Sequence, residues 1–170
     1  MTELKNNPSQ MDRATFIDTF GGVYEHSAWV AEKLWDGGLS PAHDQMDVLA
    51  QGMAEVVAAA NDQMKLDLIR AHPDLAGKAA ARGELTNEST SEQARAGLGE
   101  CTEEEYTRFQ NYNAAYTAKF GFPFIKAVRN SNRHEILQGF KERLENDAAT
   151  EFQTALHEID KIAAFRLQDL

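Results

Sequence analysis

Three short segments of the sequence carry side chains that can move protons or bind an anion. They read HPDL at His72–Leu75, STSEQ at Ser89–Gln93 and GFPFIKAVR at Gly121–Arg129. All three fall within or beside stretches that interrupt an otherwise helical pattern of apolar residues. Irregular segments held by a rigid scaffold are common places for binding and catalysis.

His72 is the first candidate because it precedes Pro73. A residue before proline is biased away from the helical region, so His72 is expected to end a helix. An imidazole titrates near neutral pH and can act as an acid or a base from such a fixed terminus. A purely structural role is also open, since a histidine at a helix C-terminus complements the helix dipole.

Ser89 and Glu92 have the spacing of a capping box, which predicts that a helix begins at Ser89. The same helix N-terminus would present N–H groups and positive dipole to an anion. The neighbouring Gln93 adds a carboxamide that can both donate and accept a hydrogen bond.

The third segment is apolar, interrupted by proline and without helical periodicity. Gly121 and Pro123 predict a tight turn that exposes the backbone amides of Phe124 and Ile125. Arg129 follows the apolar run, so it is expected to be partly enclosed and to pair with a carboxylate of the protein or of a ligand.

The remaining titratable residues do not predict a metal or redox centre. His134-Glu135 and His157-Glu158 each lack a second histidine four residues after the first, so we interpret both as helix surface positions. Cys101 is the one cysteine, which leaves no internal disulfide and no multi-thiolate metal site.

Apolar residues recur at helical spacing along most of the chain, and sustained alternation is absent. We therefore predict an all-α fold, with residues 1–170 forming a single compact domain of roughly seven to nine helices. The clearest predicted helix begins at the capping box of Thr102 and Glu105 and ends at Gly121. Asn61 and Ser131 are predicted to cap two others.

Composition narrows the class of protein. Seventeen Lys and Arg against 27 Asp and Glu give a formal charge of −10 over 170 residues. That balance disfavours a surface built to grip nucleic acid or an anionic membrane. No apolar run could span a bilayer, residues 1–10 lack a signal-peptide core, and residues 168–170 lack a peroxisomal signal. We expect a cytoplasmic protein.

The three motifs, in this order, resemble the family of 2-oxo-4-hydroxy-4-carboxy-5-ureidoimidazoline (OHCU) decarboxylases, and the resemblance covers nearly the whole chain. It implies an all-helical, cofactor-free homodimer that makes (S)-allantoin and CO2 in the last step from urate. It also implies His72 and Glu92 as catalytic residues. The substrate-binding residues that it implies are Pro73, Ser89, Thr90, Ser91, Glu92, Gln93, Phe124, Ile125, Lys126, Ala127, Val128 and Arg129.

Two other classes of protein are compatible with parts of the sequence. A helical interaction module would need only the amphipathic helices, and it predicts that 121–129 is buried packing with no pocket joining it to His72. A redox or metal enzyme on a helical scaffold would need a second thiol or a ligand cluster.

Overall fold

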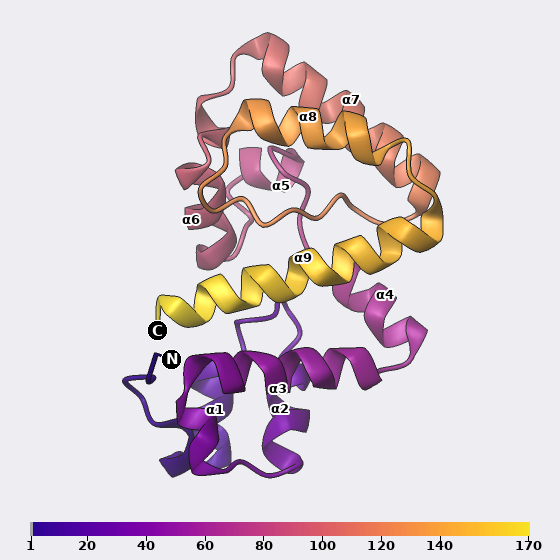
Figure 1. Cartoon of the computed structure of the whole chain (residues 1–170). Coiled ribbons are helices and arrows are strands. Elements are labelled where there is room, and N and C mark those ends of the chain that lie inside the picture. The colour runs from indigo at the N-terminus through magenta and orange to yellow at the C-terminus, as the bar shows by residue number, and fades with distance from the viewer. Residues whose placement is uncertain (1) are drawn as a thin grey trace. The chain divides into compact units, whose positions relative to one another are not determined.

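The computed structural model describes residues 2–170, and its regular elements there are helices. Nine α-helices and three short 3₁₀ helices form in this range (Figure 1), with a single β-bridge between Glu3 and Gln45. The predicted all-α class and the predicted number of helices are confirmed.

The chain divides into two compact units. The first unit comprises residues 2–71 and 159–170, and the second comprises His72–Glu158. The last helix contributes residues to both units. All three candidate segments of the sequence, 72–75, 89–93 and 121–129, belong to the second unit, so one set of helices positions them.

The first unit contains α1 (Arg13–Phe20), α2 (Trp29–Asp36), α3 (Met46–Ala59), α4 (Asp62–Arg70) and the end of α9 (Ala148–Gln168). Asn61 caps α4 as predicted, because its side chain accepts the Met64 N–H at 2.8 Å. Two buried contacts tie the end of α9 to the segment before α2. Tyr24 donates to Asp160 at 2.7 Å, and Arg166 pairs with the buried Glu25 at 2.7 Å.

The second unit contains α5 (Lys78–Ala81), α6 (Asn87–Arg95), α7 (Glu103–Phe120), α8 (Arg133–Arg143) and the beginning of α9. Its core is aromatic. Rings of α7 and α8 contact each other, and Phe124, from the segment between these two helices, contacts rings of both. Tyr116 and Phe124 lie 5.3 Å apart, and Phe124 stacks on Phe140 with centroids 3.9 Å apart. The extended 121–132 segment therefore runs beside α8 (Figure 1).

The predicted ends of α7 are confirmed. Thr102 and Glu105 form the reciprocal capping box, and Gly121 ends the helix in the left-handed conformation with φ of 79°. Glycine adopts this φ without the steric penalty that a Cβ imposes. Gly121 thus sets the direction in which the chain leaves α7 toward the candidate site.

Two predicted caps are wrong by one to three residues. Helix α6 begins earlier than expected, with Thr86 as N-cap accepting the Ser89 N–H at 3.2 Å, so Ser89 lies inside the helix. Helix α8 is capped by Asn132 rather than Ser131, whose hydroxyl donates to Glu135 instead. Thr, Asn and Ser are all competent caps, so the side-chain type alone does not choose among neighbours.

Replacing either of two glycines in this region by alanine is expected to change the free energy of unfolding, in opposite directions. Gly121→Ala should lower the free energy of unfolding by about 1–2 kcal/mol, because it places a Cβ in a left-handed residue. Gly139→Ala, inside α8, should raise it by about 0.5–1 kcal/mol, because the new Cβ would lie 3.6 Å from Phe124 and makes an ordinary contact. Urea unfolding of both variants measures the difference, and changes of the same sign would contradict this account of Gly121.

Candidate active site

His72 lies immediately beyond α4 and is the first residue of the second unit. The helix ends at Arg70 with Ala71 as its C-cap, as the following proline led us to expect. His72 is only 7% exposed, and Pro73 is half-buried. The imidazole is therefore enclosed just beyond the end of α4, a position that fits both the acid–base and the structural interpretation.

The chain after His72 makes a strained turn. Ala76 has φ of 50°, a left-handed conformation that costs a non-glycine residue about 1–3 kcal/mol. Gln93 stabilises this turn: its Oε1 accepts the Ala76 N–H at 3.0 Å, and its Nε2 donates to the Asp74 carbonyl at 3.2 Å. Burial raises the pKa of the Asp74 carboxyl, which lies two residues from His72.

The predicted contact residues on helix α6 differ in how far they are exposed to solvent. Ser89 and Gln93, one turn apart, are buried, Glu92 is half-buried, and Thr90 and Ser91 are exposed. The backbone N–H of Ser89 already donates to the Thr86 hydroxyl. The anion-binding helix start that we placed at Ser89 is therefore corrected, because the first turn begins at Asn87.

A cavity of about 570 Å³ opens within the second unit. Thr90 and Gln93 line it together with Ala76 and Gly77 of the strained turn, and Cys101 is also part of its wall. Its size is typical of sites for small molecules. Two of the five predicted α6 residues thus border open space beside the turn that follows His72.

The predicted third segment packs against the core through four of its nine residues, of which Phe122 is the first. Phe124, Ile125 and Val128 are buried, whereas Lys126, Ala127 and Arg129 are half-buried. The burial of the apolar members is what the interaction-module alternative expected. The partial exposure of the others leaves polar groups at the surface of the same segment.

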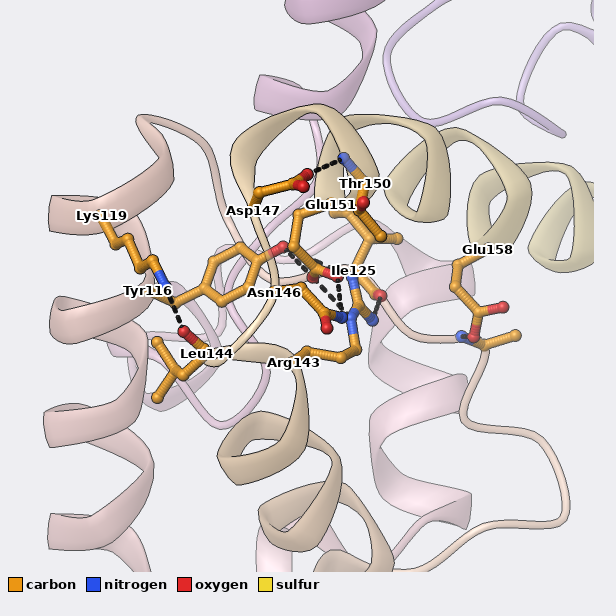
Figure 2. Close-up of polar contacts among 11 residues, drawn as sticks. Tyr116, Lys119, Ile125, Arg143, Leu144, Asn146, Asp147, Thr150, Glu151 and Glu158 are labelled. Carbon is orange, nitrogen blue, oxygen red and sulfur yellow. Dashed lines mark hydrogen bonds and ion pairs between the residues drawn. The ribbon is translucent and has the colours of Figure 1, made fainter.

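Two charged side chains hold the backbone of this segment (Figure 2). The Ala127 N–H donates to Glu158 at 3.2 Å, and Arg143 donates to the Ile125 carbonyl. The Ala127 amide, which we predicted to contact a ligand, thus has an acceptor inside the protein. The Arg143 guanidinium also lies 4.3 Å from the centre of the Phe124 ring.

Arg143 belongs to a polar network around the buried Glu151, which every other member contacts (Figure 2). Arg143 Nε lies 2.7 Å from Glu151 Oε1, and Tyr116 donates to the same oxygen at 2.6 Å. Asn146 donates to the other carboxylate oxygen at 3.0 Å. Burial, foremost, raises the pKa of the Tyr116 hydroxyl. The network fixes the start of α9 against α7 and α8.

The sequence did not indicate the role of Arg143, Glu151 or Glu158. Each has the side-chain type and surroundings of an ordinary helix-surface charge, and Glu158 was interpreted as a surface position. The structure places Glu151 at 0% and Glu158 at 8% exposure, so that interpretation of Glu158 is wrong. The one available signal was the apolar spacing of α9, which puts residues 151, 155, 158 and 162 on one face.

The other titratable candidates include two histidines, which lie at the helix surface as the sequence predicted. Within residues 2–170, no three His, Cys, Asp or Glu side chains are grouped so that they could hold a metal ion. His134 and His157 are exposed. Burial, foremost, raises the pKa of the Cys101 thiol, which disfavours a reactive thiolate. In the same range, no helix is long and apolar enough to cross a membrane.

The fold and the candidate site define an all-α protein whose acid–base and binding candidates lie in one helical unit. A model of the OHCU decarboxylase family matches residues 9–168, and the chain belongs to that family. It is therefore a decarboxylase, which is a lyase.

Relatives and solved structures agree with this assignment. A 2-oxo-4-hydroxy-4-carboxy-5-ureidoimidazoline decarboxylase of Halalkalicoccus jeotgali is 43% identical over 162 residues, which are 95% of this chain and 88% of the relative. A crystal structure of (S)-allantoin synthase superposes with a TM-score of 0.76 at 33% identity, over 96% of this chain and 52% of the other. The chain thus spans about half of that protein. An OHCU decarboxylase crystallised in the presence of (S)-allantoin shares the fold, with a TM-score of 0.67 and 22% identity over 86% of this chain and 93% of the other.

Proposed function

We propose that this chain decarboxylates OHCU to (S)-allantoin and CO2, the last step from urate to allantoin in purine catabolism. The observation that carries the proposal is the match of the family over residues 9–168, which includes all three candidate segments. The burial of His72 beside a turn held by Gln93 adds a physical reason, because an acid–base group must be held in place to act.

The chemistry requires positioning more than activation. The substrate carries a hydroxyl and a carboxylate on one ring carbon, next to a C=N bond. When the bond to the carboxylate breaks, its electron pair passes into the C=N group, so the substrate supplies its own electron sink. No pyridoxal or thiamine is then needed. The enzyme orients the carboxylate and delivers a proton to one face of the ring.

We assign Glu92 to the substrate hydroxyl and His72 to proton transfer. Gln93 bonds the ureido or ring carbonyl group through the second hydrogen of Nε2, since its first bond goes to the Asp74 carbonyl. The remaining contacts are assigned to other residues that the resemblance to the family implies. They are Pro73, Ser89, Thr90, Ser91, the backbone of Phe124, Ile125, Lys126 and Val128, and the Arg129 guanidinium.

The wider organisation follows from the same proposal. Both compact units belong to one OHCU decarboxylase domain over residues 1–170, because the family match crosses the boundary between them. The protein acts on a small molecule, binds no nucleic acid or membrane, forms a homodimer and works in the cytoplasm without a cofactor.

A coupled assay tests the function directly. Urate is converted by urate oxidase and hydroxyisourate hydrolase, and the chain is added last. Ultraviolet absorbance should show faster loss of the ureidoimidazoline, and circular dichroism should show growth of one hand of allantoin. A decay rate and an optical signal equal to those without the chain would overturn the proposal.

The charge of the chain predicts an unusual salt dependence. A protein with a formal charge of −10 repels an anionic substrate, so its global field opposes the encounter. Raising ionic strength to about 0.15 M screens that repulsion and should leave kcat/KM unchanged or higher. Initial rates across a salt series measure this, and a steep loss of kcat/KM would show that long-range attraction drives substrate capture.

A further inference from the structure

Three carboxamides from two helices hold the backbone of the turn after His72. Gln93 of α6 binds the Ala76 N–H and the Asp74 carbonyl. From α7, Gln110 donates to the Ala76 carbonyl at 2.7 Å, and Asn113 donates to the Leu75 carbonyl at 2.9 Å. The peptide groups of residues 74–76 are therefore fixed by side chains that lie 17 to 38 positions away in the sequence.

The strained residue is the one held most firmly. Ala76 has a left-handed backbone, and both its N–H and its carbonyl are bonded to carboxamides. A left-handed alanine persists only where surrounding groups determine it, and such residues concentrate at functional sites. The turn begins two residues after His72, whose imidazole we assign to proton transfer.

Asn113 is kept at this position at a cost. Its side chain is 5% exposed, and its Oδ1 has no hydrogen-bond partner within residues 2–170. A buried acceptor without a partner is unfavourable, and an apolar side chain of similar size would avoid that cost. What Asn113 supplies that leucine does not is the Nδ2–H bond to Leu75.

We infer that Asn113 and Gln110 are positioning residues for His72: they hold the 74–76 turn in its strained form and so fix where the imidazole meets the substrate. This inference rests on the proposed function. Neither side chain needs to touch the substrate, because their contacts are to the backbone of the turn.

The test is Asn113→Leu, with Gln110→Leu as a second variant in case the first does not fold. Because a misplacement of about 1 Å can cost about 10²-fold in rate, kcat should fall between about 10- and 100-fold. KM should stay close to the native value, since binding groups on α6 remain in place. Amide hydrogen exchange followed by NMR should show faster exchange of the Ala76 N–H in both variants.

The matched control is Ile136→Val, which removes one methyl group from a fully buried residue of the same unit. It should lower the melting temperature while leaving kcat and Ala76 exchange unchanged. Native kcat in folded Asn113→Leu and Gln110→Leu, or unchanged exchange at Ala76, would overturn the inference. Failure of the proposed function is a separate outcome, since it would leave the native chain itself without activity.

Discussion

Replacing His72 by asparagine should lower kcat/KM by about 10²–10⁴-fold and abolish the excess of (S)-allantoin. Asparagine is smaller and polar, so it fits the buried position without a clash, but it cannot exchange a proton near neutral pH. The substrate then loses CO2 unaided and is protonated on either face. The coupled assay measures both quantities at once, the rate by absorbance and the handedness by circular dichroism.

His134→Asn is the matched control for this experiment. His134 has a side chain that is 73% exposed on α8 and lies outside the candidate site. The same chemical change there should leave rate and optical signal at native values. Far-ultraviolet circular dichroism should show that both variants remain helical. If folded His72→Asn gave a product of unchanged optical activity, the assignment of His72 to proton transfer would be wrong.

The second large effect is expected on stability. Arg143→Met should lower the free energy of unfolding by about 3–5 kcal/mol, because it leaves the carboxylate of Glu151 buried without its cation. Glu151 is 0% exposed, so water does not replace the lost partner. Activity should fall as well, since Arg143 donates to the Ile125 carbonyl in the segment that we propose to bind the substrate.

Two further variants isolate the cause. Arg13→Met removes the cation of an exposed pair with Asp36, whose side chains are 50% and 58% exposed, and should change stability little. The double variant Arg143→Met with Glu151→Leu should recover much of the loss, because neither charge remains buried alone. Urea unfolding of all three variants measures the change in the free energy of unfolding. Equal losses of that free energy from Arg143→Met and Arg13→Met would mean that burial of the Arg143–Glu151 pair is unimportant.

The helices themselves were largely predictable from the sequence. The Thr102–Glu105 box and Gly121 bounded α7 correctly, and Asn61 capped α4, because these signals act between residues three or four apart. The same local rules failed where two adequate caps compete. Thr86 was preferred to Ser89 and Asn132 to Ser131, and nothing in the local sequence distinguishes the members of each pair.

The candidate site shows the same division. His72, Glu92, Gln93 and the GFPFIKAVR segment were found from residue type, spacing and resemblance to a family. How they are held was not predictable: the Gln93 carboxamide bonds the strained turn, and the Ala127 amide is bound by Glu158. Those bonds join residues 17 and 31 positions apart, and no periodic pattern links such distant positions.

The sequence by itself determined an acidic, all-helical chain of the OHCU decarboxylase family and the boundaries of α4 and α7. The tertiary structure decided which polar groups are enclosed and what they bond. Arg143 and Glu151 are indistinguishable from surface charges until α8 and α9 meet, and the left-handed Ala76 is bonded to side chains of two helices that lie far from it in the sequence. The physical reason is range: caps and amphipathic stripes act within a few residues, whereas burial and hydrogen-bond satisfaction depend on every element that packs nearby.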